Sequence, residues 1–171
     1  NGLYALHRDS AGTIWVGGWD EGLNRYDPES NTFYKFRSDG KPGQSINNDN
    51  VFAIADDQRG SLWIGTIGGG LHRYDYATGQ FTYYPQALEK EGYLHDHYVN
   101  ALLLPHSGDL WVSTYTTLNR FDFETETFQH FTRQSYQGAG MSNADLLALF
   151  EDSRGALWLA TEGGLIRFNP Q

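Results

Sequence analysis

The sequence contains no cysteine, and this absence excludes several kinds of site. A chain without cysteine forms no disulfide bond, no thiolate zinc site and no thiol nucleophile. Cytoplasmic and periplasmic proteins can both lack cysteine, so the composition leaves the cellular compartment open.

Basic residues are also few: 12 Lys and Arg stand against 21 Asp and Glu, which gives a formal net charge of −9. Binding a polyphosphate needs a basic stripe, so nucleic acid and anionic lipid are not expected as partners. Long apolar runs are absent as well, since the stretch 101–104 is far shorter than the roughly 18 residues of a membrane span. No membrane contact by this segment is expected. Because no signal peptide or initiator methionine stands at Asn1, we expect a piece of a longer protein.

What the sequence does contain is a tryptophan that recurs at nearly constant spacing. Trp15, Trp63, Trp111 and Trp158 are separated by 48, 48 and 47 residues. Their neighbourhoods repeat too, as SAGTIWVGG, RGSLWIGT, SGDLWVST and RGALWLAT. A period in the forties is typical of arrays in which each unit buries its apolar face against its neighbours. The chain is therefore predicted to contain four copies of one unit.

The second unit shows most clearly how each copy is expected to fold. Short apolar or alternating runs at 51–55, 62–66, 71–75 and 81–84 are separated by turn-forming residues, as in consecutive strands. The first two runs are apolar at consecutive positions, which indicates that neighbouring sheets cover both faces. Small antiparallel sheets stacked around an axis form a β-propeller.

The predicted fold is all-β: a β-propeller fragment with three complete four-stranded antiparallel blades and a fourth blade that lacks its last strand. The blades are expected at about 3–36, 51–84, 99–131 and 146–168, within a single partial domain that covers 1–171. An open fan exposes two apolar blade faces, so we expect homo-oligomers formed through the open blade ends. The alternative is a closed ring of four blades.

The repeated residues are interpreted as scaffold. A large residue that returns at one strand position indicates packing between blades, and this applies to all four tryptophans. An arginine on the third strand is expected to make the same polar bond in each blade, at Arg25, Arg73, Arg120 and Arg167. A glycine is expected to give the turn between the first two strands its backbone freedom, at Gly12, Gly60, Gly108 and Gly155.

These motifs together resemble a known family. The pattern V-x-A-I-x-x-D-x-x-G-x-L-W-I-G-T, followed by G-G-L-x-R-Y-D and F-x-x-Y, is similar to the two-component regulator propeller repeat. The polar segments QSINNDNV (44–51) and GMSNADLL (140–147) resemble that family's lead into the first strand. In the third copy Pro105 and His106 replace the usual acidic turn, and Thr116 and Thr117 replace the glycines.

The resemblance implies a sensor region outside the cytoplasm, periplasmic or extracellular, commonly with seven blades per propeller. It also implies a parent protein anchored in the inner membrane, with a histidine kinase, hybrid kinase or diguanylate cyclase as output. The propeller itself is expected to be non-enzymatic and to need no cofactor.

A candidate binding face follows from the strand order. If successive strands alternate in direction, the loops between second and third strands share one end of the propeller with the linkers between blades, 37–50, 85–98 and 132–145. We call this end the top face, and it carries the residues without counterparts in other copies. The candidate ligand-binding residues are Trp19, Asp20, Glu21, Tyr93, His95, His97, Tyr115 and Glu162.

Flat aromatic rings beside carboxylates suit a neutral or cationic polyhydroxyl ligand such as an oligosaccharide. The alternative is that Trp19 covers the loop of the first blade and that the acids are solvated surface. His95-Asp96-His97 has the spacing of a chelating pair, but no third ligand is fixed by spacing, so a solvated loop is favoured and no metal site is predicted.

Three functions fit the sequence. The leading one is a non-enzymatic sensor in which a ligand or partner shifts the receptor toward a signalling state. The second is a stand-alone protein-interaction scaffold, and the third is a carbohydrate-active enzyme. The turn at 9–15 resembles the Asp-box of sialidase-type propellers, but its Asp and Gly lie three residues apart instead of two. No catalytic residues are assigned, because no pair of carboxylates across a cleft can be fixed from the sequence.

Overall fold

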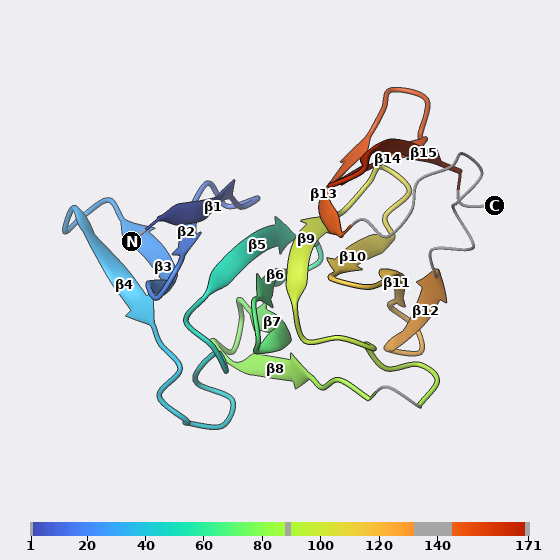
Figure 1. Ribbon diagram of the computed structural model, residues 1–171. Helices are drawn as coiled ribbons and strands as arrows, with labels where there is room; N and C mark the ends of the chain where they lie inside the picture. The colour runs from blue at the N-terminus through green and yellow to red at the C-terminus, as the bar shows by residue number, and fades with distance from the viewer. Residues whose placement is uncertain (1, 88–89, 132–144, 170–171) are drawn as a thin grey trace.

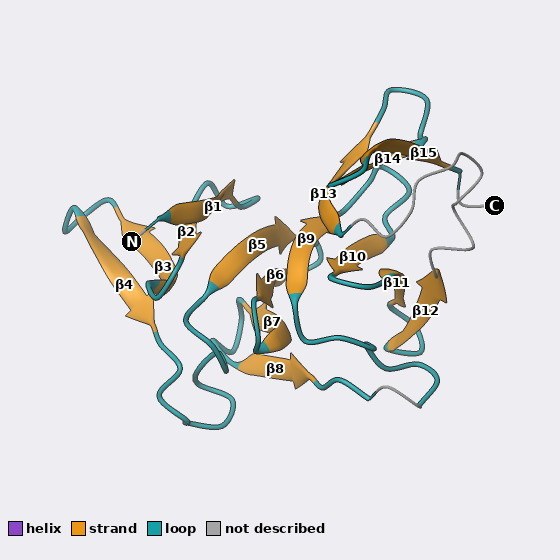
Figure 2. Cartoon of the chain, in the orientation of Figure 1, coloured by secondary structure: helices purple, strands orange, loops and turns teal. Residues whose placement is uncertain are grey.

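The computed structural model describes residues 2–87, 90–131 and 145–169. These residues form fifteen strands and the loops between them, with no α-helix (Figure 2). In this part of the chain, no helix offers the length and apolarity that crossing a membrane requires.

The strands form four antiparallel sheets, here called blades 1 to 4, and each blade takes consecutive strands from one continuous segment. Blade 1 consists of β1 (Leu3–Arg8), β2 (Ile14–Gly18), β3 (Gly22–Asp27) and β4 (Thr32–Phe36). Blade 2 consists of β5 (Val51–Asp56), β6 (Ser61–Thr66), β7 (Gly70–Asp75) and β8 (Phe81–Tyr84). Blade 3 consists of β9 (Val99–Leu103), β10 (Leu110–Thr114), β11 (Leu118–Asp122) and β12 (Thr127–Phe131). Blade 4 consists of β13 (Leu146–Glu151), β14 (Leu157–Thr161) and β15 (Gly164–Phe168).

The blades stand side by side in chain order, from blue to red in Figure 1. The first strands β1, β5, β9 and β13 contact one another in series and lie innermost, while β4, β8 and β12 form outer edges. No sheet of the described residues combines strands from two blades. The predicted all-β propeller fragment, with three four-stranded blades and one three-stranded blade, is confirmed.

The turn between the first two strands of each blade has the same construction. Its glycine adopts a positive φ in every copy, for example 88° at Gly12 and 106° at Gly60. A side chain with a Cβ adopts this conformation at a cost, which explains the repeated glycine.

An aspartate joins this turn to the tryptophan. Asp57 accepts hydrogen bonds from the indole Nε1 of Trp63 at 3.0 Å and from the backbone N of Ser61 at 2.9 Å. Asp9 binds Trp15 at 2.7 Å in the same way, and Asp152 binds Trp158 at 2.9 Å. Blade 3 has Pro105 at this position, which has no side-chain acceptor. This bond was not predicted, although the constant six-residue spacing from Asp to Trp was a visible signal.

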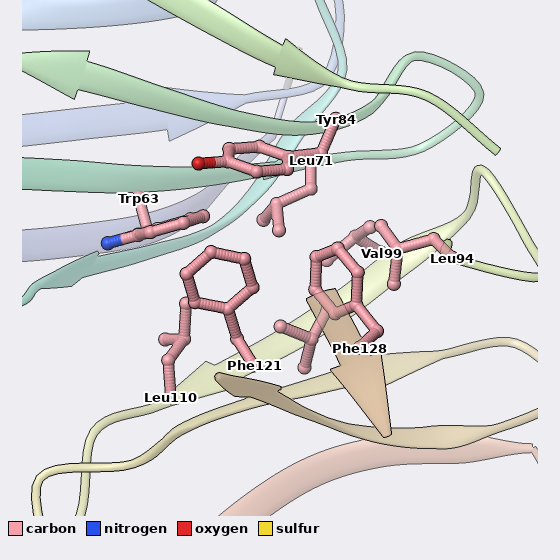
Figure 3. Packing of buried hydrophobic residues seen from close by; sticks show 9 residues of the cluster. Trp63, Leu71, Tyr84, Leu94, Val99, Leu110, Phe121 and Phe128 are labelled. Carbon is pink, nitrogen blue, oxygen red and sulfur yellow. The ribbon is translucent and has the colours of Figure 1, made fainter. Parts of the chain in front are cut away.

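The core lies at the seams between blades. At the seam of blades 2 and 3, Trp63 faces Phe121 with ring centroids 4.8 Å apart and lies 5.2 Å from Tyr84 (Figure 3). Trp63 is fully buried, and Leu94 from the linker and Val99 from β9 complete this cluster. Trp15 packs in the same way toward blade 2, and Trp111 toward blade 4. The tryptophan of one blade is thus covered by the next blade.

Two blade faces remain exposed among the described residues. Trp158 is only partly buried and lines an apolar hollow of about 280 Å³ with Ala148, Leu149, Phe150, Ala160 and Leu165. On blade 1, Leu3 is 70% exposed and Leu6 is 77% exposed. These faces correspond to the faces that are buried at the inner seams.

The repeated arginines do not share one polar bond, so that expectation is wrong. Arg73 pairs with Glu126 at 2.9 Å, Arg120 donates to Gln129 at 2.7 Å, and Arg25 lies over a tyrosine ring at 5.2 Å. What the four copies share is register, because each arginine lies opposite a repeated tryptophan: Arg25 and Trp15, Arg73 and Trp63, Arg120 and Trp111, Arg167 and Trp158. The partners differ in place, because Glu126 lies in the turn before β12 of the next blade, whereas Gln129 and Tyr34 lie on the outer strands β12 and β4 of the arginine's own blade.

Candidate functional site

The top face is fixed by a hydrogen bond that recurs in every blade. The backbone N of the residue after the second strand donates to the carbonyl of the residue before the first strand. The pairs are Trp19 to Gly2 at 2.9 Å, Ile67 to Asn50 at 2.9 Å, Tyr115 to Tyr98 at 3.0 Å and Glu162 to Asp145 at 3.3 Å. The loops and the linker ends therefore lie together at one end of each blade, as the alternating strand directions predict.

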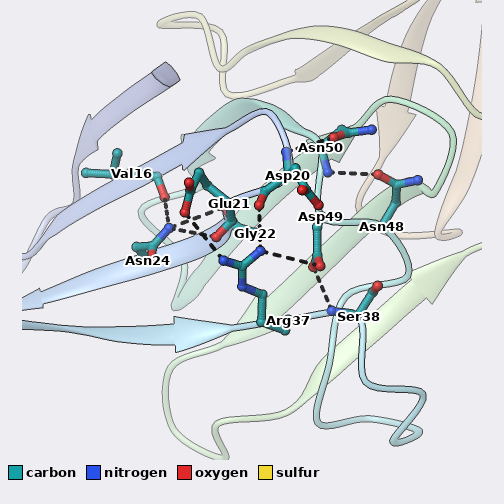
Figure 4. Close-up of polar contacts among 10 residues, drawn as sticks. All are labelled: Val16, Asp20, Glu21, Gly22, Asn24, Arg37, Ser38, Asn48, Asp49 and Asn50. Carbon is teal, nitrogen blue, oxygen red and sulfur yellow. Dashed lines mark hydrogen bonds and ion pairs between the residues drawn. The ribbon is translucent and has the colours of Figure 1, made fainter. Parts of the chain in front are cut away.

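Arg37 organises the polar side of this face at blade 1 (Figure 4). Its guanidinium donates to the carbonyl of Asp20 at 2.7 Å, lies 3.4 Å from the Glu21 carboxylate and lies 3.5 Å from the Asp49 carboxylate. The backbone N of Asp20 donates to Asn50 at 2.9 Å, and Asp20 adopts a φ of 56°. Glu21 thus pairs with Arg37, and the backbone of Asp20 fixes the loop.

Three aromatic rings, two of them exposed and one partly buried, form a cluster where blades 1 and 2 meet. Tyr4 stacks on Phe52 with centroids 4.3 Å apart and an interplanar angle of 10°, and Trp19 meets Phe52 edge-on at 5.9 Å. Tyr4 is 58% exposed and Trp19 is 48% exposed. We call Tyr4, Trp19 and Phe52 the aromatic platform. Tyr4 and Phe52 were not predicted as site residues because they lie inside strands. In blades 1 and 2, however, the second residue of the innermost strand is aromatic in each case.

Tyr93 and His95 lie elsewhere, at the outer edge of blade 3. The linker from blade 2 crosses β12, where the backbone N of Phe128 donates to the carbonyl of Gly92 at 3.0 Å. The His95 ring stacks on His130 of β12 at 3.8 Å. Burial, together with the neighbouring His95, lowers the pKa of His130. Lys90 donates to the Tyr93 hydroxyl at 2.9 Å.

His97 and Tyr115 meet around Tyr98. The Tyr98 ring lies 4.6 Å from His97 and 6.3 Å from Tyr115. The carbonyl of His97 accepts hydrogen bonds from the backbone N of two glycines in the loop between β6 and β7. The imidazole Nδ1 of His97 lies 2.5 Å from Gln86 Oε1. His95 and His97 thus have different partners and do not chelate together. Within residues 2–87, 90–131 and 145–169, no group of three His, Asp or Glu side chains has a metal-binding arrangement.

The eight predicted residues therefore do not form one site. Trp19, Asp20 and Glu21 lie beside the innermost strand β5, whereas Tyr93 and His95 face the outer strand β12. His97 and Tyr115 lie at the top of blade 3, and Glu162 at the top of blade 4. Two linkers contact an outer strand on their way to the top face, at Gly43 beside β8 and at Gly92 beside β12, and these contacts were not visible in the sequence.

Comparison with known proteins identifies the repeat. The family model described as two component regulator propeller matches residues 45–68 and 140–163. This chain carries two component regulator propeller repeats. The first matched segment spans a linker end, β5 and β6 of one regulator propeller repeat. Among curated proteins, no sequence matches this chain.

Several solved structures share the fold over the whole chain. Two structures of the extracellular domain of BT4673 from B. thetaiotaomicron align over 100% of this chain, each with a TM-score of 0.77 and with identities of 27% and 26%. That protein is described as a candidate one component system or hybrid two component system. The extracellular domain of BT3049, from the same organism, aligns with a TM-score of 0.74 and 22% identity.

A WD40 β-propeller domain of Doa1, 16% identical, shares the fold alone with a TM-score of 0.69. The present chain spans only 22% of the BT4673 chain and 29% of the BT3049 chain. The similarity to the extracellular domains thus covers only part of those longer chains.

Proposed function

We propose that this chain is part of the periplasmic or extracellular sensor region of a membrane-anchored receptor of the two-component type. The observation that carries the proposal is the full-chain similarity to the extracellular domain of BT4673 at 27% identity. In this proposal the propeller binds a ligand or partner at its top face. Differential binding shifts the receptor between states, and a kinase or cyclase elsewhere in the parent protein reads the shift.

The propeller itself is proposed to be non-enzymatic, because two carboxylates near the aromatic platform pair with an arginine. Glu21 and Asp49 both pair with Arg37. A glycosidase instead needs two carboxyl groups facing each other across a substrate cleft. The paired state of these acids favours a sensor over the carbohydrate-active enzyme.

The aromatic platform supports an oligosaccharide or another small polyhydroxyl compound as the ligand. Exposed rings offer flat apolar surfaces on which the carbon-hydrogen face of a sugar can lie, and Asn50 and Asp20 supply polar groups beside them. A stand-alone interaction scaffold would use the same surface for a protein partner. Saturable binding of a sugar separates these two functions.

Replacing Trp19 with alanine is expected to weaken sugar binding about fivefold, because a lost aromatic contact removes about 1 kcal/mol. The measurement is isothermal titration of the sensor region with neutral oligosaccharides that bind the unaltered protein. Tyr34→Ala is the matched control, since Tyr34 is 62% exposed but lies on the outer strand β4. Equal affinity of the Trp19→Ala and Tyr34→Ala variants would contradict a site on the platform.

We also propose that the exposed faces of blades 1 and 4 form homo-oligomer contacts. Phe150 is 64% exposed and Leu165 is 57% exposed, so an aspartate at position 150 places a charge on an apolar contact. In sedimentation equilibrium of the chain 1–171, Phe150→Asp is expected to lower the average mass, whereas Thr82→Asp on β8 leaves it unchanged. A monomer at all concentrations before substitution would overturn this proposal.

A further inference from the structure

The end of the propeller opposite the top face, here called the bottom face, carries the turns between first and second strands. A carboxylate closes two of its three seams. Between blades 1 and 2 the backbone N of Ser10 donates to Asp56 Oδ2 at 2.5 Å. Between blades 3 and 4 the backbone N of His106 donates to Glu151 Oε2 at 2.8 Å. An acid at the end of the innermost strand thus binds the turn of the preceding blade.

The seam between blades 2 and 3 lacks this bond. Leu104 stands at the position of Asp56 and Glu151, and Pro105 follows it, so neither side chain can accept a hydrogen bond. A hollow of about 530 Å³ opens at this seam. Its walls are Asp57, Gln58, Arg59, Leu104, Pro105, His106 and Gly108. The departure from the repeat therefore coincides with a space that the other seams fill with a carboxylate.

Arg59 is the charged group whose side chain is available in this hollow. Its guanidinium lies 4.1 Å over the Phe123 ring and donates to the carbonyl of Gly108 at 3.1 Å, which fixes its plane. Among the described residues, no carboxylate pairs with the guanidinium. Asp57 is satisfied by the indole of Trp63 and two backbone N–H groups, and His106 is bonded to Glu151. A fixed guanidinium with unused N–H groups matches the two oxygens of a carboxylate.

A second hollow, of about 400 Å³, lies on the other side of Arg59 and is lined by Asp109, Asp122 and Glu124 among others. These acids repel an anion, whereas Asp57, the carboxylate that lines the first hollow, already accepts three hydrogen bonds, so an anionic ligand belongs on the side of Leu104 and Pro105. The net charge of −9 disfavours an extended polyanion but permits one carboxylate to meet one guanidinium.

We propose that the hollow at the seam of blades 2 and 3 binds a small organic acid. Arg59 holds the carboxylate, and Leu104 and Pro105 form an apolar wall against the rest of the molecule. The volume lies within the roughly 300–1,000 Å³ of small-molecule sites. This site lies at the opposite end of the blades from the aromatic platform and does not depend on the sensor function.

The test uses benzoate and its neutral counterpart benzamide, which have nearly the same shape. Each is titrated into isotopically labelled protein at pH 7 and followed by NMR chemical shifts. Benzoate is expected to saturate and to shift the amides of Arg59 and Gly108. Benzamide is expected to bind about tenfold or more weakly, because it offers the guanidinium one neutral oxygen in place of two charged ones.

Two variants locate the site. Arg59→Gln is expected to weaken benzoate binding about tenfold or more. Arg154→Gln is the matched control and is expected to leave binding unchanged, since Arg154 holds the same turn position in blade 4 and its backbone N binds Asp152 as that of Arg59 binds Asp57. Leu104→Asp places a carboxylate where the other seams have one, and is expected to abolish benzoate binding while the protein stays folded.

Equal binding of benzoate and benzamide would overturn the proposal. Equal loss in the Arg59→Gln and Arg154→Gln variants would overturn it as well, because the anion would then respond to net charge and not to this hollow. Retention of benzoate by Leu104→Asp would place the ligand elsewhere.

Discussion

Replacing Trp63 with alanine is expected to lower the free energy of unfolding by about 4 kcal/mol, whereas Trp158→Ala is expected to lower it by about 2 kcal/mol or less. The two residues share a strand position, an arginine opposite and a bond from Nε1 to an aspartate, at 3.0 Å and 2.9 Å. They differ in burial, because blade 3 fully buries Trp63 whereas Trp158 lies on an exposed blade face.

The comparison isolates the contribution of packing between blades. Urea unfolding followed by far-ultraviolet circular dichroism gives the free energy for each variant without relying on tryptophan fluorescence. Equal losses at both positions would mean that the tryptophans stabilise their own blade and not the seam. A larger loss at Trp63 supports a stack in which each blade depends on the next.

Acidification from pH 7 to pH 4.5 is expected to destabilise the protein through His72. This imidazole is fully buried on β7, where its Nε2 accepts from the backbone N of Asn47 at 3.1 Å and its Nδ1 has no hydrogen-bond partner. Burial lowers the pKa of His72 from 6.5 to about 4. The folded state thus keeps the ring neutral while the unfolded state takes up a proton.

The sign of the effect follows from this difference in pKa. The contribution of neutral His72 to the free energy of unfolding is fully present above pH 6.5 and is lost as the pH falls toward 4. The loss amounts to about 3 kcal/mol in total for His72 alone. Burial also lowers the pKa values of His7 and His130, so these residues act in the same direction.

His72→Asn tests this account, because asparagine already occupies the corresponding positions in blades 1 and 3, at Asn24 and Asn119. The unfolding free energy of both proteins is measured between pH 7 and pH 4.5. The variant is expected to lose clearly less stability over this range than the unaltered protein. Parallel pH profiles would show that His72 does not carry the effect.

The strands and their order could be predicted from the sequence because the signals are local. In the second copy each turn carries a glycine and each strand has its own apolar run, so that copy predicted β5 to β8 to within one residue. Repetition then extended the pattern to the other copies, including the blade that has three strands among the described residues.

The arginine bonds and the candidate site were less predictable because they depend on contacts between distant residues. Arg73 meets Glu126 from the neighbouring blade, and no spacing along the chain indicates that pair. The sequence groups Tyr93 and His95 with Trp19 because none of them has a counterpart in the other copies. In the structure, however, the linker places Tyr93 and His95 beside β12. The segment 132–144, part of the third predicted linker, lies outside the described residues.

The most direct test of the sensor proposal is the location of this propeller in the cell. The chain has no cysteine, so Thr82→Cys on the exposed edge of β8 introduces a single thiol into this segment of the parent protein. A maleimide that enters the periplasm but does not cross the inner membrane is added to intact cells, and the parent protein without the substitution gives the background. Labelling of the intact cells is predicted, whereas labelling only after lysis would contradict a sensor outside the cytoplasm.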